Sequence, residues 1–571
     1  MKSPAPLNTI RNLVAAALGL SLVLLFAADI AFAAKPSWFP KVSCKQAWKN
    51  KDLGAYNAAV DAKLDAAKGN VGYPGYVDRL KKSGVTRQSC YKDWTVLVYM
   101  AADNDLSPYA FWDLFEMEGA FASGRFAAST LKSDLLVQTD TKGPTGIRRF
   151  HMFQAPGTAY AAPKGKEQFD NFSPASIKSP LVDFRPETKP ATSADHKARM
   201  REFLDWGMRQ YPADRYFVIV WGHGQGWASN PAAGSIKEAE AKNRYVDKED
   251  LPISFDDLPD FSAPPKEKSP FTGRFGGLVF TETPGDYLGI PALSGVLKSV
   301  VSKTLEGNQI DVYAADACLM QMAEVAYEIS DSARFVIGSA QIQSFLGLPY
   351  RRLMYEINSG GFDGAGALVG KTDEAYLVAR MLPKLAEKSL DPVHGQQGRA
   401  DKEASKTFTM SSISTASLRN ELVPAIEDLG IALSAYINED PLRTMDLRFL
   451  MKSTPNFMSG ARELGSFIGL LEFQLREEAE AKGKLTPNAK ILSDKVVAVR
   501  KAIAFSVVNY GFGTGYRGNA EPLHLLGFRS LGIWLPQSPQ EYNSRVGDFV
   551  KSTLYKDTQG AWAGWLKAVY Q

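Results

Sequence analysis

The sequence predicts an α/β fold in which helices cover both faces of a mostly parallel central sheet. Beyond residue 93, short apolar runs alternate with longer stretches of helical spacing. The apolar runs are nearly continuous, as in strands that are buried on both faces. We expect strands at 94–100, 135–139, 216–221, 310–314 and 335–339, with helices at 107–121, 195–210 and 319–329.

Length and composition indicate an ordinary globular protein of more than one domain. The 571 residues exceed what one hydrophobic core normally holds together. Hydrophobic residues make up 45% and charged residues 22% of the chain, which excludes a disordered composition. The net charge of +4 comes without a basic stripe or an aromatic stacking motif, so we expect no nucleic acid partner.

Residues 1–33 have the pattern of a signal peptide. Lys2 and Arg11 precede an uncharged run at 13–28, and Ala31 and Ala33 are the small residues before a cleavage site. An uncleaved membrane anchor is the alternative, but the run is shorter than the roughly 20 apolar residues that span a bilayer. We expect a secreted or periplasmic protein with no stable membrane anchor after signal cleavage.

Residues 34–92 form a predicted N-terminal extension that contains two of the three cysteines, Cys44 and Cys90. In an exported protein, a disulfide between these two would leave Cys318 as a free thiol. The alternative is three buried, unreactive thiols, because the sequence gives no distance between the first two. Basic residues at 81, 82, 87 and 92 suit a removable pro-segment, and a permanent structural collar is the equal alternative.

Residues 93–360 form the predicted main α/β domain, and two further regions depart from its pattern. A Pro-rich, highly charged insertion at 228–273 has no clear period, as in a disordered or functional loop. Residues 361–571 form a largely helical region, with helical spacing at 372–388, 418–437 and 464–482. A late strand at 525–535 is expected to return to the core and rejoin the main sheet.

Two of the predicted strands end in reactive side chains. The run 216–221 leads to His223 in Trp-Gly-His-Gly-Gln-Gly-Trp, and the run 310–314 leads to Cys318 in Asp-Ala-Cys-Leu-Met. Because parallel strands present their carboxyl ends at one edge of a sheet, both side chains should meet there. A thiol beside an imidazole is a nucleophile beside a general acid and base. A helix that begins directly after Cys318 would favour the thiolate.

The candidate oxyanion hole consists of the backbone N–H groups of Gly224 and Cys318, because a glycine after the histidine lets the backbone approach a substrate closely. Each reactive residue alone has an ordinary explanation. A lone cysteine after an apolar strand is most often part of the core, and a lone histidine is most often a satisfied hydrogen-bonding group. Their occurrence together at two strand ends favours the catalytic interpretation.

Acidic residues are expected at the same edge of the sheet. Asp316 precedes Cys318 by two residues, where a partly desolvated carboxylate would select a Lys or Arg side chain of a substrate. The alternative is an N-cap for the following helix, a position that aspartate favours. Asp103, Asn104 and Asp105 follow the first strand and are candidates for supporting the substrate pocket or for binding a cation.

Further motifs accompany the histidine and cysteine segments. They are a first strand and its loop at 94–105, a helix at 203–213, and a closing segment at 531–536 followed by Trp562 and Trp565. With this set, the chain from residue 94 to the C-terminus resembles the clostripain-like cysteine peptidases, family C11 of the caspase-type clan. The resemblance implies a caspase-like α/β/α sandwich and a cysteine endopeptidase that acts on protein or peptide substrates.

The resemblance also implies cleavage after Lys or Arg through Asp316, self-processing of a zymogen, and calcium dependence. The sequence itself requires no cofactor and contains no Asp-rich calcium loop of known spacing. One departure is the neutral run at 340–343, where the family tends to carry acidic residues. The neutral run argues against the basic preference and against calcium, and leaves the expected nucleophile unchanged.

Two other functions fit the same residues. A non-catalytic secreted binding module would keep the fold, and loss of peptide cleavage in Cys318→Ala with unchanged binding would separate the two. A transpeptidase or amidase acting on cell-wall peptides would use the same cysteine and histidine without needing a basic pocket. Product analysis with and without a competing amine would distinguish this third function.

Overall fold

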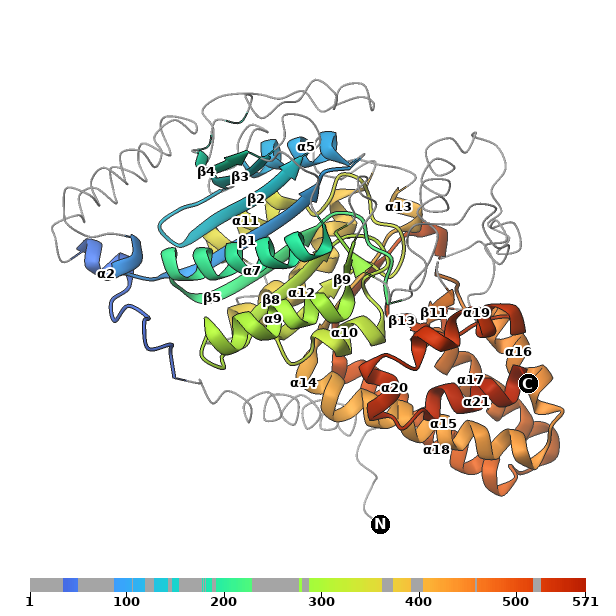
Figure 1. Cartoon of the computed structure of the whole chain (residues 1–571). Coiled ribbons are helices and arrows are strands. Elements are labelled where there is room, and N and C mark those ends of the chain that lie inside the picture. Colours follow the sequence, from blue (N-terminus) through green and yellow to red (C-terminus); the bar gives the residue numbers. More distant parts are fainter. Residues whose placement is uncertain are drawn as a thin grey trace, which may run out of the picture.

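The computed structural model describes residues 34–49, 87–104, 106–118, 128–141, 146–153, 177, 179, 181–186, 192–227, 277–279, 287–361, 373–391, 404–457, 460–516 and 525–570. Its centre is a nine-stranded sheet in the order β12-β10-β9-β8-β5-β1-β2-β3-β4. Helices cover both faces of this sheet (Figure 1). The predicted α/β/α sandwich is therefore confirmed.

The five central strands are parallel and largely buried. In β1, Val96 and Val98 contact one hydrophobic cluster while Leu97 and Tyr99 contact the other, because successive side chains of a strand point to opposite faces. β5 lies between β1 and β8, so the strands that lead to His223 and Cys318 are neighbours. The parallel strands are β1 (Lys92–Ala102), β2 (Ser133–Thr141), β5 (Ala213–Trp221), β8 (Ile310–Asp316) and β9 (Ala333–Gly338).

Antiparallel strands extend the sheet on both sides. Those beyond β2 belong to the main domain, whereas those beyond β9 come from the C-terminal region. The C-terminal region is thus built into the same sheet as the strand-end residues. The antiparallel strands are β3 (Gly146–His151), β4 (Leu181–Pro186), β10 (Thr409–Ser414) and β12 (Val507–Phe512).

Two groups of helices bury the two faces of the sheet. On one face lie α7 (Ser193–Gln210), α9 (Ile290–Lys303) and α10 (Ala323–Ile329). On the other face lie α5 (Ser107–Met117), α11 (Tyr350–Ser359) and α12 (Glu374–Ser389). Both clusters consist mainly of aliphatic and aromatic side chains, so burial of apolar surface holds the three layers together.

Short elements complete the described part of the chain. They are α2 (Cys44–Lys49), the 3₁₀ turn η1 (Arg87–Ser89), β6 (Gly277–Leu278), β7 (Leu288–Gly289), α13 (Ala404–Thr407), α14 (Thr415–Ser417), the π-helical turn η4 (Leu418–Leu422) and the 3₁₀ turn η6 (Thr514–Tyr516).

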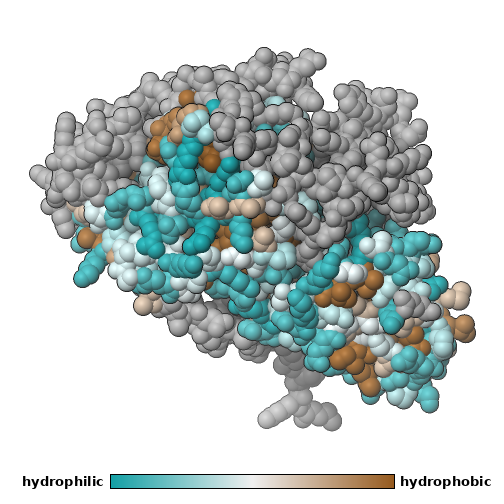
Figure 2. Space-filling view, viewed as in Figure 1, coloured by the Kyte–Doolittle hydropathy of each residue, from teal (hydrophilic) through white to brown (hydrophobic). Residues whose placement is uncertain are grey.

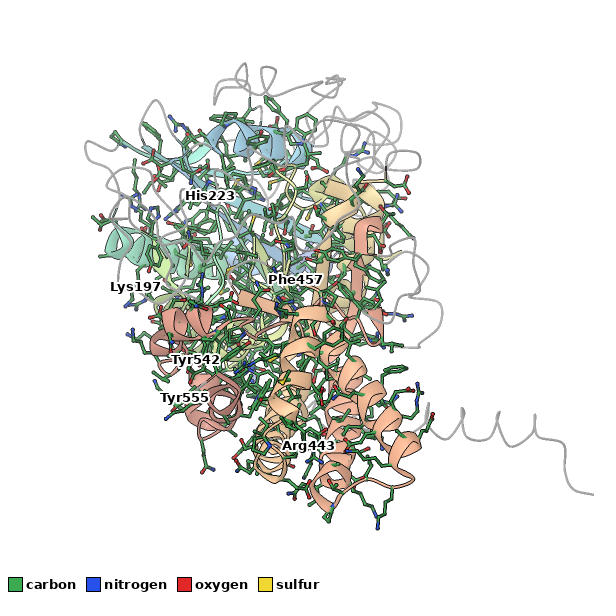
Figure 3. The ribbon with its side chains drawn as sticks, turned by 90° about the vertical axis from the view of Figure 1, so that its right-hand side faces the viewer. Lys197, His223, Arg443, Phe457, Tyr542 and Tyr555 are labelled. Carbon is green, nitrogen blue, oxygen red and sulfur yellow. A yellow bond between two sulfur atoms is a disulfide. The ribbon has the colours of Figure 1, made fainter. Side chains whose placement is uncertain are left out.

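The C-terminal region is largely helical, as expected. Figure 3 shows Arg443 in this region, well away from His223, and Figure 2 shows hydrophobic patches on its surface. The buried Arg443 guanidinium bonds Glu439 at 2.7 Å and Glu478 at 3.4 Å, which ties three helices together. The helices are α15 (Val423–Glu439), α16 (Arg443–Ser453), α17 (Leu464–Lys482), α18 (Pro487–Ser506), α19 (Pro539–Phe549), α20 (Thr553–Asp557) and α21 (Ala561–Tyr570).

The late strand does not rejoin the main sheet. The segment at 525–535 contributes β13 (Gly532–Trp534), which pairs with β11 (Ala461–Glu463) in a separate two-stranded sheet. β10 and β12 already extend the main sheet beyond β9. The segment still enters the core, because Trp534 is fully buried and its N–H donates to Glu324 of α10 at 2.8 Å.

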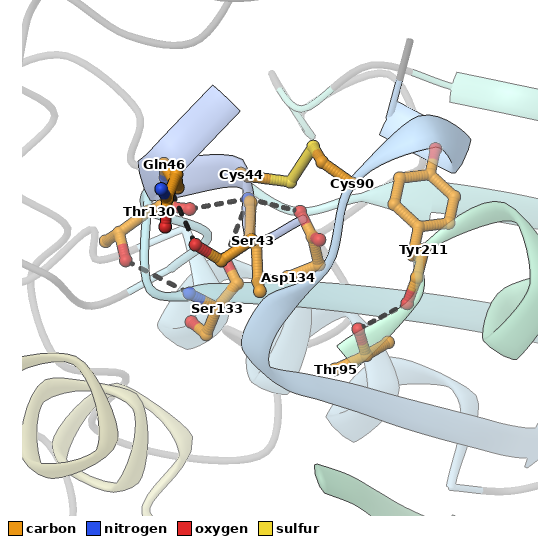
Figure 4. The surroundings of a disulfide bond; sticks show 10 residues. Ser43, Cys44, Gln46, Cys90, Thr95, Thr130, Ser133, Asp134 and Tyr211 are labelled. Carbon is orange, nitrogen blue, oxygen red and sulfur yellow. Dashed lines mark hydrogen bonds and ion pairs between the residues drawn. A yellow bond between two sulfur atoms is a disulfide. The ribbon is translucent and has the colours of Figure 1, made fainter. Parts of the chain in front are cut away.

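The described parts of the N-terminal extension are fastened to the main domain. Cys44 and Cys90 form a disulfide beside the start of β1, as Figure 4 shows. Nearer the N-terminus, Ser37 bonds Glu306 through its N–H at 2.8 Å and its hydroxyl at 2.5 Å. The indole of Trp38 donates to the Thr304 carbonyl at 2.7 Å. These contacts join the extension to the segment between α9 and β8.

Candidate active site

The register of two adjacent strands places His223 and Cys318 at one edge of the sheet. Trp221 of β5 pairs with Asp316 of β8, and the Gly222 N–H donates to the Asp316 carbonyl at 3.2 Å. His223 and Cys318 each follow this pair by two residues. The same offset from a paired position in parallel strands brings the two residues to neighbouring loops, as the strand-end pattern predicts.

The two loops are in direct contact at Gly224. A Cβ atom on Gly224 would lie 2.3 Å from the Cys318 carbonyl oxygen and 3.0 Å from the Ala317 side chain. Such distances exclude any larger residue without movement of the backbone. The glycine after the histidine therefore allows the histidine loop to pack against the cysteine backbone.

Cys318 is largely buried. Its residue exposure is 9%, and it is the free cysteine among the described residues. The backbone N–H of Gln343 donates to the Cys318 sulfur at 3.3 Å. An N–H donor stabilises a thiolate more than a thiol, because the hydrogen bond strengthens when its acceptor is charged. His223 is half-buried.

The helix after Cys318 begins later than expected. α10 starts at Ala323, and Met322 is its N-cap residue without a side-chain cap. Leu319 has a left-handed backbone with φ of 61°, and its N–H donates to the Gln341 carbonyl at 3.2 Å. Because this backbone cannot continue a right-handed helix, the cysteine is not at a helix N-terminus. The expected helix-dipole effect at Cys318 is therefore wrong.

Asp316 holds the loop that follows β9 rather than capping a helix. Its carboxylate is buried with 4% residue exposure. One oxygen accepts the Leu348 N–H at 2.8 Å and the Tyr350 hydroxyl at 2.6 Å, and the other accepts the Gln343 side-chain amide. The N-cap interpretation is excluded, because the helix begins seven residues later with a different cap.

Burial and the nearby carboxylates of Asp316 and Asp113 raise the pKa of the Tyr350 hydroxyl well above its ordinary value. The hydroxyl therefore stays protonated throughout the pH range in which proteins work. A protonated hydroxyl can donate to the Asp316 carboxylate at any of these pH values. Tyr350 is thus a permanent partner of Asp316.

A second carboxylate, Asp113 of α5, lies next to Asp316. A Cβ atom on Gly347 would lie 2.6 Å from one Asp113 oxygen and 2.8 Å from one Asp316 oxygen. The Trp221 indole donates to the same Asp113 oxygen at 2.7 Å. With φ of +59° and two carboxylates against it, Gly347 cannot be replaced by a larger residue without strain. The structure thus brings a carboxylate from helix α5 next to the carboxylate at the end of β8.

The three candidate residues in the loop after β1, which are Asp103, Asn104 and Asp105, differ in their surroundings. Asn104 is buried and serves the loop itself, since its amide donates to the Ala101 carbonyl at 3.1 Å and its oxygen accepts the Leu106 N–H at 2.9 Å. Asp103 is one of the charges around Asp140, whose pKa is raised to about 6 chiefly by burial. Asp105 lies outside the described residues.

Within the described ranges, no group of three His, Cys, Asp or Glu residues is arranged to hold a metal ion. The Asn104 amide group is already used to fix its own loop. No step of the proposed chemistry involves calcium. Calcium dependence stays a prediction from the family resemblance.

Sequence reasoning missed three residues of this site: Asp113, Gln343 and Tyr350. Asp113 lies within a helix whose other residues are mostly apolar, and Tyr350 follows the cysteine by more than thirty residues. Gln343 was noticed only as part of a neutral loop. The available signal was Gly347, since a glycine between two leucines, Leu346 and Leu348, is typical of a close backbone approach.

Comparison with known proteins found one matching family model and several similar solved structures. The model of the clostripain family matches residues 98–239 and 275–380. An inactive zymogen C11 protease from Parabacteroides distasonis is 17% identical, with a TM-score of 0.47, and the alignment covers 84% of this chain and 99% of that one. A secreted C11 cysteine protease from Bacteroides thetaiotaomicron, in complex with an irreversible peptide inhibitor, is also 17% identical, with a TM-score of 0.47 and coverage of 82% and 98%. No curated protein matches. In these two segments, which hold both His223 and Cys318, the chain is similar to the clostripain family, the cysteine peptidases of family C11.

Proposed function

We propose that the chain is an exported cysteine endopeptidase in which Cys318 is the nucleophile, His223 is the general acid and base, and substrates are cut after Lys or Arg. The observation that carries the proposal is the contact of the two strand-end loops, where Gly224 packs against the Cys318 carbonyl. This contact brings a thiol and an imidazole to one edge of the sheet. Both groups are of the kind that a cysteine peptidase requires.

The reaction begins with the proton of Cys318 transferred to His223. The thiolate attacks the scissile carbonyl carbon, and the backbone N–H groups of Gly224 and Cys318 stabilise the oxyanion that forms. The carbon–nitrogen bond then breaks, and the leaving amine takes the proton from His223. Water attacks the resulting thioester while His223 accepts its proton. Release of the Cys318 thiolate yields the carboxylic acid product, and the return of the proton from His223 to the sulfur restores the enzyme.

The preference for a basic side chain is supported by the paired carboxylates. Asp316 and Asp113 both approach Gly347, close to the nucleophile strand. A Lys or Arg side chain of a substrate would offset the proximity of two like charges in a buried setting. Asp113 supplies the second acidic group that the neutral run at 340–343 lacks.

The proposal is tested with a peptide library that varies the residue before the cleaved bond. Purified protein should cleave Lys and Arg peptides at least about tenfold faster than matched neutral peptides, since one charge pairing in a cleft is worth a few kcal/mol. Mass analysis of the products identifies the cut bond. Equal rates for basic and neutral peptides would contradict the proposed specificity, and the absence of any cleavage would contradict the proposed activity.

Export is supported by the disulfide and by the sequence pattern of a signal peptide. Disulfides such as Cys44–Cys90 persist mainly in oxidising compartments, which include the periplasm and the extracellular space. Within the described residues, no helix is long and apolar enough to cross a membrane. Residues 1–33 lie outside the described residues. A secreted or periplasmic location therefore belongs to the proposal.

Self-processing in the insertion at 228–273 should leave the enzyme assembled. The insertion lies outside the described residues, but Trp227 before it and Leu278 after it are fully buried in one hydrophobic cluster. Strands β5 and β8, on either side of the cut, pair in parallel. We expect mass spectrometry to find the insertion cut in the wild type and intact in Cys318→Ala. An intact insertion in both proteins, with a fully active wild type, would exclude self-processing.

A cut in the N-terminal extension would not release the extension. A cut after residue 81 or 82 lies between Cys44 and Cys90, so the disulfide would keep both pieces together. Lys92 is excluded as a cutting site in the folded chain, because its side chain is fully buried and bonded to Asp134 at 2.6 Å. The same mass analysis, run with and without a reductant, should show release of an N-terminal piece only after reduction.

A further inference from the structure

The loop from Ser339 to Tyr350 is fixed to its surroundings at several points. Near its start, the Thr409 hydroxyl of β10 accepts the Gln341 N–H at 2.9 Å and lies 3.2 Å from the Ser339 hydroxyl. The Gln341 carbonyl accepts the Leu319 N–H, directly after the nucleophile. The loop therefore runs alongside the cysteine backbone, and a strand of the C-terminal region supports it.

Gln343 is the residue of this loop that contacts both Cys318 and Asp316. Its backbone N–H donates to the Cys318 sulfur at 3.3 Å. Its side-chain amide donates to one Asp316 oxygen, while Leu348 and Tyr350 bond the other oxygen. The residue is 92% buried, since its exposure is 8%. One residue thus connects the nucleophile to the carboxylate two positions before it.

We propose that Gln343 is a positioning residue, whose side-chain bond to Asp316 holds its own N–H on the Cys318 sulfur. This inference rests on the proposed function, in which Cys318 attacks and Asp316 receives the basic side chain. Asp316 then has a second task besides recognition, because it anchors the loop that donates to the nucleophile. A basic side chain that enters the pocket meets the carboxylate oxygen that Gln343 already occupies. Substrate binding at Asp316 is in this way coupled to the reactivity of Cys318.

The physical reason lies in the charge of the attacking sulfur. A hydrogen bond to the charged form of a group lowers the pKa for losing its proton, and losing that bond raises it. The titratable groups around Cys318 are His223 on the histidine loop, Asp316 on β8, Asp113 on α5 and Tyr350 on α11. Replacing Gln343 removes none of these groups, and Asp316 keeps its bonds from Leu348 and Tyr350. A change in the titration of the thiol would therefore report the lost N–H donor.

The test measures the alkylation of Cys318 by iodoacetamide as a function of pH. Iodoacetamide is small and uncharged, so its reaction reports the thiolate without needing the substrate pocket. In Gln343→Met, which fills the same space without an amide, we expect the midpoint of the alkylation rate to rise by about one pH unit. Below the midpoint, this shift lowers the rate about tenfold. Gln343→Ala should give the same direction.

The matched control is Ser344→Ala in the adjacent position. The Ser344 hydroxyl accepts the Leu346 N–H at 3.3 Å. The described side-chain hydrogen bonds of Cys318 and Asp316 come from Gln343, Leu348 and Tyr350 and do not involve this hydroxyl. An unchanged midpoint in Ser344→Ala, with a raised midpoint in both Gln343 variants, supports the proposal. A wild-type midpoint in Gln343→Met overturns it, and so does an equal shift in the control.

The outcome is independent of the proposed activity. Alkylation needs no peptide cleavage, so a shift in Gln343→Met would support the positioning role even if no substrate were cut. Conversely, a wild type that cuts after Lys and Arg, with no shift in either Gln343 variant, would overturn the positioning role alone. Thermal unfolding of each variant confirms that the compared proteins are folded.

Discussion

Cys318→Ala and His223→Ala should each lower kcat for peptide cleavage by about 10⁴-fold or more, because a nucleophile and its proton-transfer partner act as a unit. The alanine at 318 removes the atom that forms the thioester, and the alanine at 223 removes the donor of a proton to the leaving amine. Neither change should unfold the protein. Cys318 occupies a loop at the sheet edge, and His223 is half-buried there.

The measurement is steady-state cleavage of a Lys peptide, together with circular dichroism of each variant. Cys318→Ser is the matched control for shape, because oxygen replaces sulfur with little change in volume and is a far weaker nucleophile without further activation. It should be nearly as inactive as Cys318→Ala. Full activity in Cys318→Ala or in His223→Ala would show that the chemistry occurs elsewhere.

Asp316→Asn should lower cleavage after Lys or Arg by about 10²- to 10³-fold, which lies within the range expected from the roughly 2–5 kcal/mol lost when one partner of a buried charge pair is removed. Cleavage after neutral residues should change much less. The fold should survive, because the asparagine oxygen can still accept the Leu348 N–H and the Tyr350 hydroxyl. The measurement is the ratio of the two rates, taken from the peptide library.

Asp113→Asn provides the comparison for this experiment. Asp113 also approaches Gly347, and it accepts a hydrogen bond from the Trp221 indole. Its substitution should therefore lower the preference for basic residues by a smaller factor. A basic preference that persists in full in Asp316→Asn would show that another carboxylate recognises the substrate. Asp316 would then serve only to hold the loop.

The strand-end pattern identified the pair His223 and Cys318 because it depends on local signals alone. A buried strand shows itself as an apolar run, and parallel pairing then fixes which ends meet. The odd cysteine count likewise indicated the pair Cys44 and Cys90, which the structure joins. These inferences needed no knowledge of how distant segments pack.

The sequence could not indicate what distant segments contribute. α10 begins late because Leu319 has a left-handed backbone. This conformation is stabilised by a hydrogen bond to Gln341, a residue distant in the sequence. Asp113 and Tyr350 reach Asp316 only through packing of α5 and α11 on one face of the sheet. For the same reason the expected pairing of the late strand with the main sheet is wrong, since short strands pair according to which edges are open.

The central claim is tested most directly by covalent labelling with a peptide that ends in Lys and carries a thiol-reactive ketone. We expect peptide mapping by mass spectrometry to find the label on Cys318 alone. Labelling should be much slower in His223→Ala and should be slowed by an excess of a Lys or Arg substrate. A label on any other residue, or equal labelling by a ketone that ends in a neutral residue, would contradict a nucleophilic Cys318 beside a basic-selective pocket.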